Sequence, residues 1–243
     1  MIVTKFGTEN LLKTATVTAS ADTVNAPNAW DTFLTDFWQP GSGAQTLIID
    51  HGSAKPIDYW GISANLGSDS ASAAIAWSDD NISYTTIETI NPTTDAIIFR
   101  TFTSVSHRYT KITITGTAPK VGYVSTGALV EPGGTLQVPF TPPKHSGKRN
   151  PQTNVTENGL PLGNIIKYTK HEVSMNFKNV ETSWIDSAWD DFYDAMVDGL
   201  FFVMWDSSGR PTETAVCWLT EDSNPSYQDT LRMKYSLKFN CIL

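Results

Sequence analysis

One stretch of the chain has the hydrophobic pattern of an amphipathic helix. Between Ser183 and Gly199, large apolar residues recur every three or four positions, with carboxylates between them. The apolar set is Trp184, Ile185, Ala188, Trp189, Phe192, Tyr193, Met196 and Val197, and the acidic set is Asp186, Asp190, Asp191, Asp194 and Asp198. This spacing predicts a helix over residues 183–198 with one face buried against a sheet. Thr182 or Ser183 is the expected N-cap, and Gly199 the expected stop.

Strand patterns lie on both sides of this helix. Residues 171–180 alternate between apolar and polar positions, and residues 200–205 and 214–220 are continuous apolar runs. The longest alternation places Leu231, Met233, Tyr235, Leu237, Phe239 and Cys241 on one face and Arg232, Lys234 and Lys238 on the other. One strand, the helix and three more strands predict an antiparallel sheet with the helix across one face. The three cations then point toward a neighbouring subunit or a central channel, and we expect them to take part in assembly.

The first half of the chain has a different pattern. Residues 1–118 contain short apolar runs separated by turns, which is typical of a β-sandwich. The pattern changes near 116–120, so we expect two units, residues 1–118 and 165–243, and expect 1–118 to fold alone.

Residues 119–164 form the predicted arm between these units. The part from Glu131 to Asn164 is rich in Pro, Gly, Asn and Thr, and Asn158-Gly159 is a strong turn signal. Lys144, Lys148 and Arg149 make a basic cluster within it. Loops of this length are normally functional or disordered. The cluster is either a solvated loop tip or a contact with an acidic neighbour, such as the Asp-rich helix of another subunit.

Composition narrows the possible functions. The chain has 243 residues, 40% hydrophobic and 17% charged, with a net charge of −8 and an isoelectric point near 4.9. An acidic chain of this kind is a poor general binder of nucleic acid or anionic membranes. It has neither a membrane-spanning apolar run nor a signal-peptide pattern, so we expect it to be made in a cytoplasm. Cys217 and Cys241 are expected to be buried free thiols.

Four segments of the first half resemble discoidin, or coagulation-factor C-type, domains. They are residues 25–38, Leu47-Ile48-Ile49-Asp50-His51-Gly52, residues 77–84 (Trp-Ser-Asp-Asp-Asn-Ile-Ser-Tyr) and Arg108-Tyr109-Thr110-Lys111-Ile112. His51 and Asn81 depart from the family pattern, and the two terminal cysteines of the family are absent. The resemblance implies a galactose-binding-like jelly-roll sandwich. Such folds carry many functions, so the fold alone does not fix one.

The resemblance also implies a ligand loop at residues 25–38. Its candidate ligand residues are Asn28, Trp30, Asp31, Asp36 and Trp38. Aromatic rings beside amides and carboxylates are suited to sugars, although packing is the more common role of such tryptophans. Asp31 and Asp36 have oxygens that Ca²⁺ accepts, but solvated turn carboxylates are the favoured interpretation, and we expect no metal and no cofactor.

The order of elements in the second half resembles minor structural proteins of tailed-bacteriophage tails. A short strand near Gly127, a long arm, residues 158–163, then strand, helix and three strands are similar to distal tail or baseplate-hub proteins. This resemblance implies a tail-tube-like sheet and a subunit located at the tail tip of a virion. Its implied partners are copies of itself in a ring, as a hexamer or a trimer, and the tail tube and hub proteins, with DNA only as passing cargo.

Motifs for catalysis are absent from the sequence. It contains no Gly-rich phosphate loop, His-Glu-x-x-His, Gly-x-Ser-x-Gly or Cys-x-x-Cys, and its four histidines are scattered. An enzyme is therefore not expected, and the resemblance of the second half to tail proteins implies a non-enzymatic structural subunit of a phage tail tip. The alternative is a carbohydrate-binding module or host-surface adhesin that binds a glycan through the 25–38 loop, and a hydrolase with an unrecognised site is a third possibility.

Overall fold

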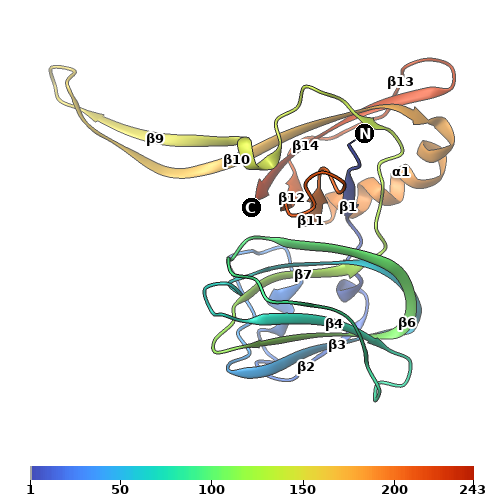
Figure 1. The fold of residues 1–243 in the computed structure, drawn as a ribbon. Coiled ribbons are helices and arrows are strands. Elements are labelled where there is room, and N and C mark those ends of the chain that lie inside the picture. Colours follow the sequence, from blue (N-terminus) through green and yellow to red (C-terminus); the bar gives the residue numbers. More distant parts are fainter. Residues whose placement is uncertain (1) are drawn as a thin grey trace.

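Two antiparallel sheets, one above the other in Figure 1, account for most of this computed structural model. The structure describes residues 2–243, except for the side chains of Pro161 and Asn164. The lower sheet contains β2 (Thr16–Ala19), β3 (Gly43–Ala64), β4 (Ser72–Ser78), β5 (Thr85–Ile90), β6 (Ile98–Gly116) and β7 (Val121–Gly127). The upper sheet contains β1 (Lys5–Gly7), β8 (Thr135–Leu136), β9 (Gly147–Val155), β10 (Pro161–Glu181), β11 (Phe201–Met204), β12 (Thr214–Leu219), β13 (Ser226–Tyr227) and β14 (Arg232–Ile242). The expected mainly β fold is confirmed.

The lower sheet closes on itself as a sandwich. Its strand order is β2-β3-β6-β4-β5, and β7 pairs with β3. The pairing of β3 with β6 is interrupted between Asp50 and Lys55, and β6 curves strongly at one side (Figure 1). The two ends of each long strand therefore contribute to different layers. Leu47, Ile49, Ile75, Ile112 and Ile114 are fully buried between them, as expected for a galactose-binding-like sandwich.

The upper sheet carries α1 (Thr182–Val197) on one face. Its strand order is β1-β11-β12-β14-β10-β8, with β13 on β14 and β9 on β10. Val173 lies opposite Phe239 and Met175 opposite Leu237, which puts these apolar side chains on the face toward the helix. Trp189, Phe192 and Met196 are buried against them, and Trp184 and Tyr193 are partly buried. The helix and its single-face packing are as predicted.

Details at the helix and strand ends differ from the sequence prediction. The N-cap is Glu181, with no side-chain hydrogen bond, so neither Thr182 nor Ser183 acts as the predicted N-cap. Thr182 and Ser183 lie one and two positions after the N-cap, because the helix already begins at Thr182. Leu231 lies outside β14 and is exposed. The alternation begins at Met233, which is partly buried against the helix face.

The two units are not separated by one boundary near residue 118, because each contains a strand from the other side of it. β1 pairs with β11 in the upper sheet, and β7 pairs with β3 in the sandwich. The chain therefore starts in the upper sheet, forms the sandwich, and returns after Gly127. Local pattern does not show this, since pairing between segments far apart in sequence leaves no local signal.

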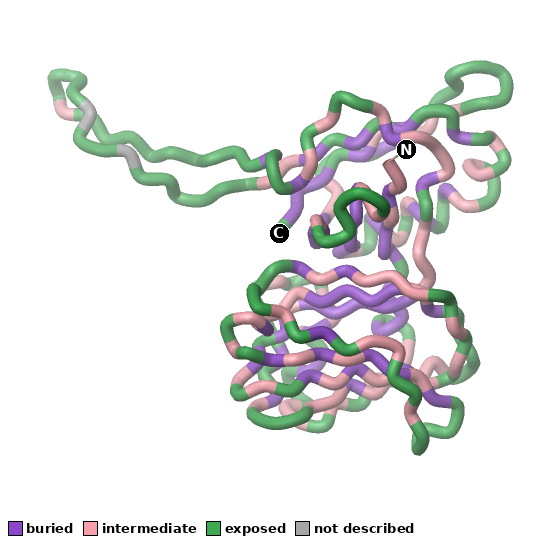
Figure 2. The backbone as a smooth tube through the Cα atoms, viewed as in Figure 1, coloured by how far each residue is buried: buried purple, intermediate pink, exposed green. Residues whose placement is uncertain are grey.

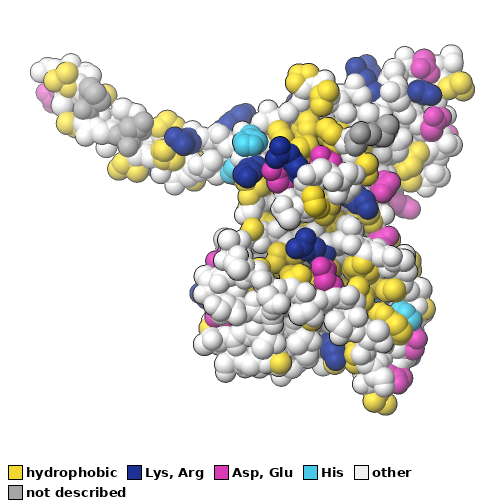
Figure 3. All heavy atoms as spheres, viewed as in Figure 1, with side chains coloured by type: hydrophobic (Ala, Val, Ile, Leu, Met, Phe, Trp, Pro, Cys, Tyr) yellow, Lys and Arg dark blue, Asp and Glu magenta, His cyan; other side chains and the backbone are white. Residues whose placement is uncertain are grey.

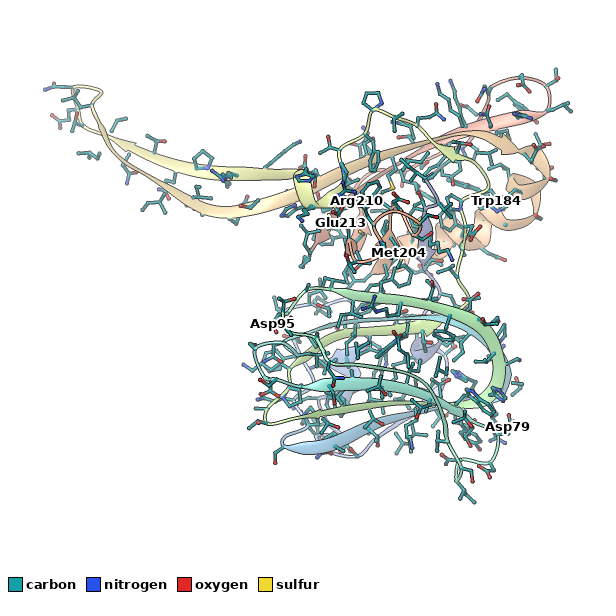
Figure 4. The ribbon with its side chains drawn as sticks, viewed as in Figure 1. Asp79, Asp95, Trp184, Met204, Arg210 and Glu213 are labelled. Carbon is teal, nitrogen blue, oxygen red and sulfur yellow. The ribbon has the colours of Figure 1, made fainter. Side chains whose placement is uncertain are left out.

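A third apolar cluster joins the two sheets. It consists of Tyr59, Ile97, Phe99 and Tyr123 from the sandwich with Leu200, Phe202, Met204 and Val216 from the upper sheet. Met204 lies at this junction in Figure 4. The ring of Phe202 stacks on Phe99 and Tyr123, at 5.6 Å between centroids in both pairs. Gly61 faces the same ring so closely that a Cβ there would lie 2.4 Å from it. The sandwich and the upper sheet are thus packed as one body.

The predicted arm, 119–164, divides into three parts. Residues 121–127 are β7, and residues 128–146 cross the upper sheet, where Val130 bridges to Phe6 and Phe140 packs on Trp205. The remainder projects into solvent as a hairpin of β9 and the first half of β10 (Figure 1). The part that projects is therefore shorter than predicted, and it is a strand ribbon that continues into the sheet. We refer to residues 147–170 as the ribbon.

Candidate functional site

The ribbon exposes apolar side chains along its length. Its strands are antiparallel from Gly147 opposite His171 to Val155 opposite Pro161, and Gly159, at φ +77°, closes the turn. Every side chain described between 147 and 170 is exposed except the partly buried Thr156 (Figure 2). Among them are Val155, Leu160, Leu162, Ile165, Ile166 and Tyr168, which are 47% to 68% exposed. Such side chains are normally covered in a stable hairpin.

The backbone of the ribbon is also incompletely paired. β10 pairs with β14 only from His171 onward, so residues 161–170 have β9 on one side and no described strand on the other. The outer edge of β9 is likewise without a strand partner in the described part of the chain. Free edges present rows of N–H and C=O groups that can pair with another chain. Both the faces and the edges of the ribbon are therefore available to a partner.

Charge is distributed unevenly between the ribbon and the rest of the molecule. Residues 147–170 contain four Lys or Arg and one Glu, a net charge of +3, which leaves −11 on the remainder. Lys148 and Lys170 both bond the Glu172 carboxylate, and these hydrogen bonds lower the pKa of Glu172 to about 2. Lys144, Arg149 and Lys167 make no ion pair with any residue described.

The cations predicted on the outer face of β14 lie where the alternation put them. Arg232, Lys234 and Lys238 are exposed, while Tyr235, Leu237 and Phe239 on the same strand are buried toward the helix. Lys238 bonds Glu221 at 2.6 Å, and Arg232 lies 3.9 Å from Glu181. Their role in assembly remains a prediction.

The predicted ligand loop places its tryptophans inward. Trp38 is fully buried, and its Nε1 donates to the Ala21 carbonyl at 2.8 Å. Trp30 is partly buried against the sandwich core. Phe33, 65% exposed, and Phe37, whose ring lies 4.8 Å from the Lys120 Nζ, present aromatic surface instead. Neither phenylalanine was among the predicted ligand residues, although both lie in the predicted 25–38 loop, because an irregular loop gives no periodicity that shows which rings are exposed.

The polar residues of this loop have mostly local roles. Asp31 Oδ1 accepts from the Phe33 backbone N–H at 2.8 Å, and Asn28 Nδ2 donates to the Phe37 carbonyl at 3.5 Å. Asp36 is exposed at the loop surface. In residues 2–243, no group of three or more His, Cys, Asp or Glu has the arrangement of a metal site. Binding of a ligand by Asn28, Trp30, Asp31, Asp36 and Trp38 remains a prediction.

A cleft of about 820 Å³ opens beside this loop, at the seam between the two units. Thr32 and Leu34 of the loop, the carboxyl end of α1 and the end of β12 with the residues after it form its walls. Its apolar lining includes Leu34, Val197, Trp218 and Leu219, and its carboxylates are Asp198, Glu221 and Asp222. We refer to this site as the seam cleft.

The far end of the sandwich carries a separate ionic cluster. His107 stacks on Trp77 at 3.4 Å between ring centroids and lies 3.0 Å from both carboxylate oxygens of Asp79, which Figure 4 labels. Nearby, Arg108 donates two hydrogen bonds to Asp50, at 2.8 and 2.9 Å. That contact, with a backbone N–H from Gly52, lowers the pKa of Asp50 from 3.8 to about 2.

The two cysteines lie in the upper sheet. Cys217 and Cys241 are free and buried, as predicted, and lie opposite each other on β12 and β14. Burial raises the pKa of the Cys217 thiol.

No helix in the described part of the chain is both long and apolar enough to cross a bilayer.

Comparison with known proteins finds similarity in solved structures alone. No family model matches the chain, and no curated protein matches it. A Clostridium perfringens module, CpGH89CBM32-6, is 18% identical over 49% of this chain and 98% of its own, with a TM-score of 0.44. The CBM32 of AlyQ, solved with 4,5-unsaturated mannuronic acid, is 28% identical over 46% of this chain and 92% of its own, with a TM-score of 0.40.

Another similar structure is chitosan-binding module 1 from a Paenibacillus sp. IK-5 chitosanase/glucanase. It is 22% identical over 49% of this chain and 99% of its own, with a TM-score of 0.43. These solved structures are carbohydrate-binding modules. Because the TM-scores lie below 0.5, no ligand or partner of this chain follows from them.

Proposed function

We propose that this chain is a structural subunit that assembles with copies of itself through the ribbon. The supporting observation is that a two-stranded ribbon with apolar side chains on its surface and two free edges extends from a well-packed body. A lone hairpin is marginally stable in water, and a neighbour that covers it buries apolar surface worth about 25 cal/mol per Å². One copy's ribbon then lies on the next copy's body.

The setting we propose for this assembly is the tip of a phage tail. The order of strand, projecting arm, helix and three strands, together with one helix on a single sheet, supports it. There the upper sheet would form a ring with its copies, as a hexamer or a trimer, against tail tube and hub proteins. Arg232, Lys234 and Lys238 would face the neighbour or the channel, and the sandwich would project from the ring.

Removal of the ribbon tests the assembly directly. Lys148 and Lys170 lie opposite each other, so Asn-Gly can replace residues 149–169 as a two-residue hairpin turn. We expect this variant to stay folded by circular dichroism and to sediment as a monomer, at a mass below the 26.7 kDa of the parent chain, while the parent forms larger species. Ile82→Asp, at an 83% exposed position on the sandwich, is the matched control and should assemble normally. Equal assembly of the shortened variant and the full chain would refute the proposal.

A second candidate function is glycan binding by the sandwich. The observation that favours it is the exposed pair Phe33 and Phe37 beside Asp36 and Lys120, since rings stack on sugar faces while polar groups bond hydroxyls. We expect Phe33→Ala and Phe37→Ala to weaken glycan binding on an array about tenfold, whereas Ile82→Ala leaves it unchanged. Absence of binding by the parent chain to any glycan would end this proposal.

A further inference from the structure

The seam cleft is placed where an apolar segment of another chain can enter. It is bounded by both units, and Val197, which lines it, is 56% exposed. Trp218 and Leu219 lie partly buried on its β12 wall, and Leu34 on its sandwich wall. Apolar side chains in a concave surface of this size are normally covered in the working state of a protein.

The surroundings of the cleft select a positively charged partner. Asp198, Glu221 and Asp222 lie in its lining, and the carboxyl end of α1, which carries the negative end of the helix dipole, points to it. Lys13 donates to the Asp198 backbone carbonyl at 3.3 Å. The Asp198 carboxylate makes no ion pair with any residue described. Glu221 is already paired with Lys238.

A row of carboxylates leads away from the cleft along the helix. Asp186, Asp190, Asp194 and Asp198 follow one another at four-residue spacing, which places them along one side of α1. All four are exposed, and none makes an ion pair with a residue that the structure describes. The receiving surface is therefore an apolar cleft continued by an acidic row.

The ribbon carries apolar and basic side chains in an order that complements the apolar cleft and the acidic row. Its outer half carries the apolar Leu160, Leu162 and Ile165, and its inner half carries the unpaired cations Arg149 and Lys167. Lys167 lies about 17 Å along the strand from Leu162. Asp186 lies about 16 Å along the helix from Val197. The distance from apolar to basic side chains on the ribbon is therefore close to the distance from the apolar cleft to the far end of the acidic row.

The ribbon of one molecule cannot make this contact with its own cleft. It leaves the sheet and runs outward, away from α1 (Figure 1). Figure 3 shows the same part as a separate projection with apolar side chains on its surface. A ribbon that enters the cleft must therefore come from a second copy.

We propose that the outer ribbon of one copy inserts into the seam cleft of the next, with Lys167 and Arg149 along the acidic row of α1. This inference rests on the proposed function and names the surface that receives the ribbon. The contact is head-to-tail, because a ribbon meets a cleft and never another ribbon. Repeated head-to-tail contacts close into rings or continue as filaments.

Two single substitutions separate the two sides of the contact. Leu162→Asp, at a 67% exposed position, damages the ribbon and leaves the cleft intact, whereas Val197→Asp damages the cleft and leaves the ribbon intact. We expect each to weaken self-association about tenfold or more. Asp222→Lys is a second cleft variant at an exposed position, in case Val197→Asp disturbs the helix. Ile82→Asp again serves as the control.

Mixing the two variants gives the sharpest test. Each pair retains one intact ribbon and one intact cleft, so the mixture should stop at a heterodimer, twice the 26.7 kDa of the chain, while neither variant associates alone. If Leu162→Asp prevents assembly but both cleft variants assemble like the parent, the cleft is the wrong receiving surface and the ribbon function stands. If Leu162→Asp and the ribbon deletion assemble normally, the proposed function itself fails.

Discussion

At the scale of single residues, alternation and helical spacing predicted burial well where an element is regular. Trp189, Phe192 and Met196 are buried as their four-residue spacing requires, and Lys234 and Lys238 are exposed as alternation on β14 requires. The loop at 25–38 has no such period. Which of its aromatic side chains points inward depends on contacts with distant strands, such as the bridge from Trp38 to Val121.

Trp189 is a large buried side chain of the helix-facing core, and its removal should be costly. Its ring lies 4.7 Å from Tyr235 and 5.2 Å from Tyr193, centroid to centroid. We expect Trp189→Ala to lower the free energy of unfolding by about 3–5 kcal/mol in urea titrations. Asp190→Ala, its exposed neighbour, should change it by about 0.5 kcal/mol or less. Equal effects of the two would place Trp189 outside the core.

The bond between Asp50 and Arg108 makes stability depend on acid. Because the folded pKa of Asp50 is about 2, below its ordinary value of 3.8, the carboxylate stabilises the fold above that ordinary value and loses this effect as the pH falls toward 2. We expect Asp50→Asn to be less stable than the parent at pH 6, with a difference that shrinks between pH 4 and pH 2. A difference that stays constant over this range would contradict the assigned bond.

At the scale of elements, the helix and the four strands around it were predictable because each has an apolar face with a period of its own. The ribbon was not predicted as a pair of strands. Both of its faces are exposed, so neither face has to be apolar and the sequence does not alternate as it does in a half-buried strand. β1 and β7 were assigned to the wrong units for a different reason. Their partners, β11 and β3, lie far away in the sequence.

The outer face of β14 gives a prediction at this scale. Lys234 and Lys238 project from the side of the sheet opposite the helix. We expect charge reversal, Lys234→Glu with Lys238→Glu, to change the unfolding free energy by less than about 1 kcal/mol, because exposed ion pairs contribute little. The same change should alter the assembly, measured by sedimentation, if this face meets a neighbour. A loss of several kcal/mol would show that the face is packed in the monomer.

At the scale of the whole molecule, the sandwich and the upper sheet depend on each other. The cluster around Phe202 buries side chains from both, and the fragment 1–118 would lack β7 and leave Tyr59 and Phe99 uncovered. The sequence favoured two independent units because composition changes at the boundary, and composition carries no information about contacts across it. Fragment 1–118 is therefore expected to fold poorly.

Phe202→Ala tests this dependence. Loss of a fully buried ring should lower the unfolding free energy by about 3–5 kcal/mol. Because the cluster is shared, we expect calorimetry of the parent and of the variant to show a single transition, shifted to lower temperature in the variant. Two separate transitions, of which the variant shifts one, would show that the units unfold independently.

The central claim is that the exposed ribbon makes this chain an assembling subunit. Sedimentation velocity of the 243-residue chain over a range of concentrations tests it most directly. We predict species whose masses are multiples of 26.7 kDa, which grow with concentration toward one closed size, and whose growth the replacement of residues 149–169 abolishes. A mass that stays at 26.7 kDa at every concentration would contradict the account.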